Sequence, residues 1–241
     1  MRIILLLGVA VLTIISTTTI AQNVFNPNDT IVRYDETKPL GSSWRPNPSR
    51  TGLQKWVSVS TNGVSSSYDA SSYKAYYINV LNKRMAFRLK FPKSYNNPDS
   101  INKRYPIMMF FHGAGEPGCA SNGGIYNNEK QLLHGGKLFM ERVDNNQFDG
   151  FLFYPQAVVT TECSNYWGSA YDAVILAALD SMIKYIKVDI DRLFVNGLSD
   201  GGRTTWRFAR AWPMRVARVA PSSMYAGTTN HTSMIHIPVW F

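Results

Sequence analysis

Apolar runs alternate with segments of helical periodicity from residue 105 onward. The runs span residues 105–111, 150–154, 192–195, 216–220 and 237–241. Short uninterrupted apolar runs are typical of strands that are buried on both faces of a parallel sheet. Between the runs, apolar side chains recur at helical spacing in residues 128–144, 172–187 and 202–212, although Gly135 and Gly136 weaken the first of these segments. The alternation predicts an α/β fold with a mostly parallel sheet flanked by helices.

The chain before residue 105 is more polar. Residues 22–55 are rich in Asn, Pro, Ser and Thr, which predicts an extended lead-in. Strand-like patterns follow in residues 55–60, 74–80 and 84–91, and the last two predict a hairpin across Leu81, Asn82 and Lys83. The serine-rich residues 61–72 predict a polar loop. We therefore expect one α/β domain over residues 56–241.

The first 21 residues have the pattern of a secretory signal peptide. Arg2 gives a positive start, residues 3–15 are almost wholly apolar, and mostly small residues lead to Ala21, after which we expect cleavage. A membrane anchor is the alternative reading, but the apolar run is short for a span and no basic flank follows it. We expect a secreted or periplasmic protein without stable membrane insertion after cleavage.

Composition narrows the function classes. Hydrophobic residues make up 45% of the 241 residues and charged residues 17%, which is typical of a globular protein, and the net charge is +9. The basic residues are scattered and form no nucleic-acid-binding motif, so we expect no nucleic-acid partner. A basic surface favours anionic polymers such as acidic cell-wall polysaccharide, although it often only keeps a protein soluble.

Two cysteines and the absence of ligand motifs complete this picture. An exported chain permits a disulfide between Cys119 and Cys163, with two unpaired loop thiols as the alternative. No cluster of His, Cys and Asp has metal-ligand spacing, and there is no phosphate-binding glycine fingerprint. We expect neither a metal nor a cofactor.

The sequence around Ser199 carries the chemistry. An apolar run ends in Gly197-Leu198-Ser199-Asp200-Gly201, and a helix-compatible segment follows. This is the layout of a nucleophile elbow, a sharp strand-to-helix turn that exposes a reactive serine. The turn brings neighbouring backbone close, so glycines are needed on both sides of the serine. The pattern predicts Ser199 as a catalytic nucleophile, and an ordinary serine in a glycine-rich turn is the alternative.

A second loop offers donors for an oxyanion. Residues 112–116 (His-Gly-Ala-Gly-Glu) follow the first buried run. In α/β-hydrolases such a loop supplies one backbone N–H and the residue after the nucleophile supplies another, which predicts an oxyanion hole made by Ala114 or Gly115 and by Asp200. We expect His112 to hold this loop by hydrogen bonding rather than to act as the base.

These motifs resemble a known family. Residues 112–116, the Tyr-Pro-Gln at 154–156 and the Val-Asp-x-x-Arg lead into the elbow are similar to those of secreted α/β-hydrolases, nearest to polyhydroxybutyrate depolymerases and feruloyl or acetylxylan esterases. The resemblance covers roughly residues 105–241. It implies a Ser-Asp-His hydrolase that acts on esters, with Ser199 as nucleophile and with Ala114 and Asp200 in the oxyanion hole.

The chain departs from this family after the elbow. The family order is Ser, then acid, then His, and the acid follows a strand similar to residues 237–241, where this sequence ends. His231 and His236 come too early in that order, and His134 precedes the serine. The resemblance therefore implies that the acid, the histidine, a last strand and a last helix lie beyond Phe241, and that a C-terminally truncated chain has little turnover. A complete protein with another base is the alternative.

Three functions remain open from the sequence. The first is a secreted serine hydrolase that cleaves carboxylic esters of a polysaccharide or polyester through an acyl-enzyme. The second is a peptidase of the prolyl-oligopeptidase type, and the third is a non-catalytic binding protein on the same fold. Tyr166 and Trp167, in a loop, are candidates for stacking on sugar or phenolic rings, whereas Trp206 and Trp212 have the helical setting of core residues.

Overall fold

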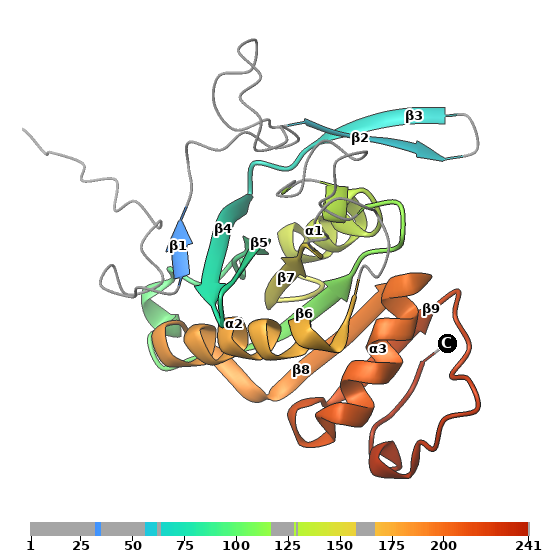
Figure 1. Ribbon diagram of the computed structural model, residues 1–241. Coiled ribbons are helices and arrows are strands. Elements are labelled where there is room, and N and C mark those ends of the chain that lie inside the picture. Colours follow the sequence, from blue (N-terminus) through green and yellow to red (C-terminus); the bar gives the residue numbers. More distant parts are fainter. Residues whose placement is uncertain are drawn as a thin grey trace, which may run out of the picture.

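The computed structural model describes residues 32–34, 56–61, 64–116, 128, 130–157 and 167–240. These residues form a seven-stranded mixed sheet with helices on both faces and a separate two-stranded hairpin (Figure 1). The predicted signal peptide, Cys119, Cys163 and Tyr166 lie outside the described residues. None of the helices in the described ranges is long and apolar enough to cross a membrane.

Nine strands and three α-helices follow one another along the described part of the chain. The strands are β1 (Val32–Tyr34), β2 (Trp56–Thr61), β3 (Val64–Asp69), β4 (Tyr73–Val80), β5 (Lys83–Lys90), β6 (Tyr105–Phe111), β7 (Phe151–Pro155), β8 (Val188–Leu198) and β9 (Arg218–Ser222). The helices are α1 (Gly136–Asp144), α2 (Asp172–Tyr185) and α3 (Asp200–Ala211). Short 3-10 turns occur at Pro98–Ser100, Lys130–Leu132, Ser169–Tyr171, Pro213–Arg215 and Thr232–Met234.

The main sheet has an antiparallel half and a parallel half. Its strand order is β1-β4-β5-β7-β6-β8-β9, in which β1, β4, β5 and β7 pair antiparallel and β7, β6, β8 and β9 pair parallel. The chain passes from β6 outward to β7 on one side and then returns to β8 on the other. Since the winding direction changes at β6, the crevice at the carboxyl ends of β6 and β8 is where such a sheet binds ligands.

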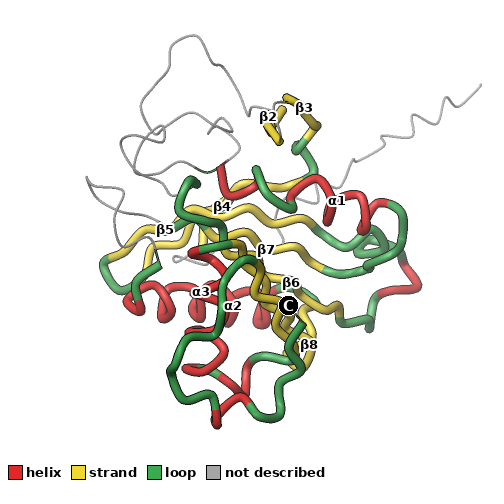
Figure 2. The backbone as a smooth tube through the Cα atoms, turned by 90° about the vertical axis from the view of Figure 1, so that its right-hand side faces the viewer, coloured by secondary structure: helices red, strands yellow, loops and turns green. Residues whose placement is uncertain are grey.

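The helices form a layer on each face of the sheet. In both views α2 and α3 lie together on one face, while α1 lies on the opposite face (Figures 1 and 2). One buried cluster packs Phe111 of β6 with Ile175 of α2 and Phe208 of α3. A second cluster on the other face joins Leu152 of β7 to Val143 of α1. The apolar runs are therefore buried on both sides, as the sequence predicts for parallel strands.

The β4–β5 hairpin confirms the prediction for residues 74–91. Leu81 and Asn82 occupy its two-residue turn, and both have positive φ, at 53° and 55°. Such turns match the twist of the paired strands, although a leucine at positive φ is uncommon. The last predicted run contributes a parallel bridge between Val219 and Val239 beside β9.

Two predictions of local structure are wrong. The serine-rich segment expected as a loop contains β3, which pairs with β2 along its whole length, including Ser58 with Ser67 and Ser60 with Ser65. Backbone pairing in a hairpin does not need apolar side chains, so the composition was misleading. The helix expected over residues 128–144 begins only at Gly136, because Gly135 adopts φ +74° and breaks the helical path.

Candidate active site

The two sequence motifs lie at the ends of adjacent parallel strands. β6 pairs with β8 in a register that places Phe111 opposite Gly197. The 112–116 loop therefore leaves the sheet beside the turn that carries Ser199. The winding of the sheet reverses at β6, so the carboxyl ends of β6 and β8 bring together two motifs that lie far apart in the sequence.

Ser199 lies on a strained turn between β8 and α3. It is exposed and has φ 54° and ψ −113°, a conformation that L-residues seldom adopt. The backbone on both sides is fixed, since the N–H of Ser199 donates to the carbonyl of Ser222 at 2.9 Å and its own carbonyl accepts from the N–H of Arg203 at 3.0 Å. Strain of this kind costs about 1–3 kcal/mol and is concentrated at functional sites.

The glycines around Ser199 allow a close approach that no other residue permits. A β-carbon on Gly201 would lie 1.9 Å from the carbonyl oxygen of Phe111, and one on Gly197 would lie 2.2 Å from the carbonyl oxygen of Gly201. Because those contacts are to backbone atoms, a side chain would force the strands or the helix apart. The glycine spacing therefore sets how near α3 comes to β6.

The 112–116 loop lies against the Ser199 turn. A β-carbon built on Gly113 would be 3.7 Å from Cβ of Ser199. Ala114 and Gly115 are exposed at the tip of the loop. Asp200 is the first residue of α3, so its N–H has no acceptor within the helix. The two segments predicted to supply oxyanion donors are thus neighbours, and the roles of Ala114, Gly115 and Asp200 stay predictions.

His112 is a buried anchor for the loop. It is fully buried, its Nδ1 lies 2.8 Å from the carbonyl of Gly113, and its Nε2 accepts from the N–H of Ala157 at 3.0 Å. Trp167 donates its indole N–H to the His112 carbonyl at 2.9 Å. Burial lowers the pKa of His112 from 6.5 to about 4, so the ring is neutral at physiological pH. Both ring nitrogens are occupied, which agrees with a loop-holding role.

Glu116 joins the loop to the turn before α1. Its side chain is 9% exposed, and Oε1 lies 3.3 Å from Nε2 of His134. Burial acts to raise the pKa of Glu116, but the hydrogen bond and charge of His134 outweigh it, and the net shift is downward. The hydrogen bond to Glu116 raises the pKa of His134. His134 lies in the turn before α1, where it forms this ion pair.

A side-chain hydrogen bond from Gln156 also holds this loop. The side-chain amide of Gln156 donates to the carbonyl of Glu116. Both Gln156 and Trp167 follow β7 along the chain, so the loop after β6 is held by the segment after β7. Trp167 is 2% exposed and packs on Phe111 with ring centroids 4.9 Å apart. The sequence suggests this tryptophan as a residue that stacks on substrate rings. No pattern in the nearby sequence predicts its hydrogen bond to the 112–116 loop.

None of the four histidines of the chain is bonded to Ser199. His231 packs on Trp206 and lies 3.1 Å from the carbonyl of Ala226. His236 is 3.4 Å from the carbonyl of Pro213, beyond the far end of α3, and a helix of this length puts it roughly 18 Å from Ser199. Among the described residues the hydroxyl of Ser199 therefore has no histidine partner.

The two other tryptophans differ in their exposure. Trp206 is 8% exposed and lies within the main core cluster, as its helical setting predicts. Trp212 is 39% exposed at the C-terminal end of α3, so the prediction of a core position is wrong for it. The helix ends there and no longer faces the sheet.

Solved structures resemble this chain in fold. No family model and no curated protein matches it. A thermostable esterase is 21% identical with a TM-score of 0.57, and the match covers 73% of this chain and 49% of the esterase. An S-formylglutathione hydrolase from Staphylococcus aureus (17% identical, TM-score 0.47, 67% and 64% covered) and a ferulic acid esterase (16%, 0.44, 60% and 57%) are also similar.

The topology and the first of these similarities define the class of the fold. The mixed sheet, its flanking helices and the strand-turn-helix at Ser199 make this an α/β-hydrolase fold. The chain spans about half the length of the thermostable esterase and less than two thirds of the other two proteins. At sequence identities this low the structural similarity shows the fold alone, because one fold can carry many activities.

Proposed function

We propose that this chain is the hydrolase domain of a secreted serine esterase that cleaves carboxylic esters of a polysaccharide or polyester. One observation carries the proposal. Ser199 is exposed on a strained turn whose backbone is fixed on both sides, and it lies against the 112–116 loop. That arrangement presents a nucleophile and backbone donors to one substrate carbonyl.

The chemistry proposed for Ser199 has two steps. Its Oγ attacks the ester carbonyl carbon, the bond to the alcohol oxygen breaks, and the alcohol leaves with a proton. Water then attacks the acyl-enzyme and releases the acid. The negative oxygen formed in each step is placed between the N–H of Asp200 and the N–H of Ala114 or Gly115.

The proposal requires a base for the proton of Ser199. The four histidines have other partners in the structure, so the identity of the base stays open. The test therefore uses the full-length protein. The predicted signal peptide supports export, and the similarity in fold to an esterase supports ester chemistry.

Labelling with a fluorophosphonate probe tests the nucleophile. The wild type should be labelled at Ser199, and Ser199→Ala should lose both the label and at least about 10³-fold of the turnover of p-nitrophenyl acetate. Ser169→Ala, which removes an exposed hydroxyl from another loop, is the matched control and should behave like the wild type. Equal labelling of wild type and Ser199→Ala contradicts the proposal.

Substrate choice separates the remaining functions. Acetyl and feruloyl esters should be hydrolysed while prolyl peptide amides are left intact. Cleavage of the amides would identify a peptidase instead. No label and no turnover from the complete protein would identify a binding protein on this fold.

A further inference from the structure

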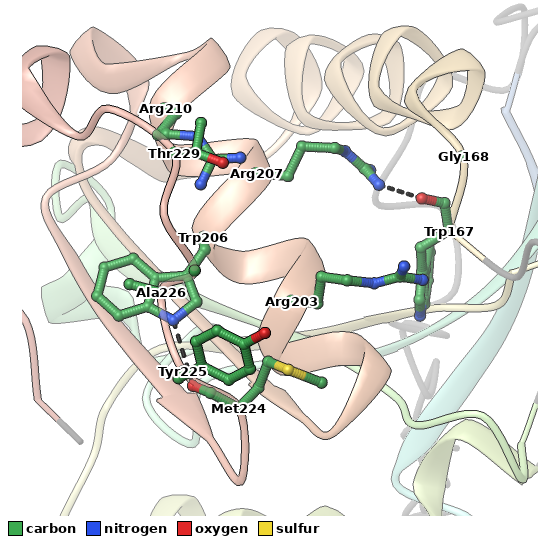
Figure 3. Close-up of a pocket in the computed structure, with 11 residues that line it drawn as sticks. Trp167, Gly168, Arg203, Trp206, Arg207, Arg210, Met224, Tyr225, Ala226 and Thr229 are labelled. Carbon is green, nitrogen blue, oxygen red and sulfur yellow. Dashed lines mark hydrogen bonds between the residues drawn. The ribbon is translucent and has the colours of Figure 1, made fainter.

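A cavity lies along α3 and begins at Arg203, one helical turn after Ser199. Its volume is about 460 Å³, and α3, the Trp167–Gly168 segment and the segment after β9 form its walls (Figure 3). Three arginines and three aromatic residues stand out among the lining side chains: Arg203, Arg207, Arg210, Trp167, Trp206 and Tyr225. The chemistry proposed for Ser199 uses none of these side chains.

The arginines lie on one side of α3 at helical spacing, and two of them have acidic partners. Arg203 pairs with Asp200 in the first turn of the helix. Arg207 pairs with Asp172 of α2, with one contact of 2.6 Å and another of 3.4 Å, and it also donates to the carbonyl of Trp167. These two arginines bring little net positive charge to the cavity.

Arg210 has no carboxylate partner among the described residues. Partial burial and the neighbouring charge of Arg207 lower the pKa of Arg210, but an arginine remains charged in proteins. The cavity therefore carries one positive charge that the described residues do not balance. A guanidinium is planar and binds a carboxylate with two parallel hydrogen bonds.

Aromatic side chains give the cavity flat apolar surfaces. Tyr225 lines the cavity and is 80% exposed, so its ring is accessible to a ligand. Trp206 is held in place because its indole N–H donates to the carbonyl of Met224 at 3.3 Å, as Figure 3 shows. Flat aromatic faces beside a cation suit a ring that carries a negative charge.

The distance from Ser199 decides which part of a substrate this cavity would hold. Arg203 follows Ser199 by about one helical turn, whereas the backbone of Arg210 lies about 16 Å along the helix axis from that of Ser199. A single sugar or phenolic unit does not span that distance. A group bound at Arg210 therefore belongs to a unit other than the one that carries the ester.

We propose that this cavity is a subsite for a ring that bears a carboxylate, such as a uronic-acid unit, within an extended ester substrate. The proposal rests on the function proposed above, since it deepens the choice of substrate. Arg210 binds the carboxylate, while Trp206 and Tyr225 contact the ring. The site thus selects acidic polymers over neutral ones.

A binding experiment without catalysis tests the subsite. Full-length Ser199→Ala is titrated with a glucuronic-acid oligosaccharide. The control ligand is the neutral oligosaccharide of the same length, in which each carboxylate has been reduced so that the units are glucose. Binding is followed by tryptophan fluorescence and by calorimetry. The acidic ligand should bind at least about tenfold more tightly. Arg210→Gln should remove this preference, whereas Arg218→Gln, an exposed arginine on β9 outside the cavity, should keep it.

The outcomes separate the subsite from the esterase proposal. Equal affinity for both ligands, or equal effects of Arg210→Gln and Arg218→Gln, overturns the subsite. Binding of benzoate in place of the uronate, lost with Arg210→Gln, identifies an aromatic acid as the carboxylate-bearing ring. If the acidic ligand binds as expected but the wild type is not labelled at Ser199, the esterase proposal fails and the subsite stands.

Discussion

The loops after β6 and β8 lie side by side but are held in place in different ways. The Ser199 turn is fixed by backbone packing, with glycines where β6 and α3 nearly touch. The 112–116 loop is fixed by side chains that come from elsewhere, chiefly His112 with Ala157 and Trp167. The first kind of support is set by local sequence, and the second depends on distant segments being folded.

The largest expected effect is the loss of the close approach at the elbow. Gly201→Ala places a methyl group 1.9 Å from the carbonyl of Phe111, so we expect at least about 4 kcal/mol of destabilisation, measured by urea unfolding, or failure to fold. Gly168→Ala is the matched control, because no atom lies within 4 Å of its added carbon. It should change stability by less than about 0.5 kcal/mol. Similar effects from both substitutions would show that backbone packing does not fix the elbow.

His112→Phe tests the side-chain support of the other loop. The substitution leaves the buried N–H of Ala157 without an acceptor and removes one of the two partners of the Gly113 carbonyl, which should cost about 2 kcal/mol of unfolding free energy. The fold should persist, in contrast to Gly201→Ala. A cost below about 1 kcal/mol would show that the hydrogen bonds to His112 do not hold the loop.

The same histidine predicts a pH dependence. Its pKa is about 4 in the folded protein and near 6.5 when unfolded, so the unfolded chain takes up a proton first as the pH falls. The stabilisation is complete above pH 6.5 and is lost as the pH drops toward 4, by roughly 3 kcal/mol. Thermal unfolding of the wild type and His112→Phe between pH 4 and 8 measures it. Between pH 4 and 8 the unfolding free energy should depend less steeply on pH in His112→Phe than in the wild type.

A smaller effect is expected from relieving the strain at Ser199. Ser199→Gly accepts φ 54° without steric cost and should gain about 1 kcal/mol of stability, while Ser199→Ala gains little because alanine has the same restriction. Both variants lose the hydroxyl, so both should lose the labelling. Equal stability of the two variants would mean that the turn is not strained.

The smallest effect concerns the Glu116–His134 ion pair. The lowered pKa of Glu116 stabilises the fold above pH 4.5, and the raised pKa of His134 stabilises it below pH 6.5, so the pair contributes fully between those values. His134 is 42% exposed, which limits the contribution to about 0.5 kcal/mol. The melting temperature of His134→Gln should therefore fall below that of the wild type by about 1–2 °C at pH 5.5.

Measurements at other pH values serve as the control for this ion pair, because they compare the melting temperatures of the wild type and His134→Gln where the pair is weakened. The difference should shrink at pH 8, as the pH rises through the raised pKa of His134, and again in strong acid, as it falls through the lowered pKa of Glu116. A difference that is the same from pH 4 to 8 would indicate that His134 contributes through packing.

The contrast between the loops also explains what could be predicted from the sequence. The buried strands, α2, α3 and the turn at Ser199 follow from local periodicity and glycine spacing, and the structure confirms them as elements of an α/β-hydrolase fold. The contacts of Trp167 and Gln156 with the 112–116 loop depend on tertiary packing, for which no local signal exists. β3 was missed because hairpin pairing of serines leaves no apolar alternation.

The mixed sheet has a consequence for how this chain folds. β4 and β5 are joined by a two-residue turn, and such a hairpin closes within microseconds. β6 and β8 are separated in the sequence by β7 and α2, so they pair only after this long intervening segment has closed into a loop. Contacts between residues far apart in the sequence make folding slow. We therefore expect the β4–β5 hairpin to acquire protection from hydrogen exchange before the β6–β8 pair. The edge that carries Ser199 would then be completed last.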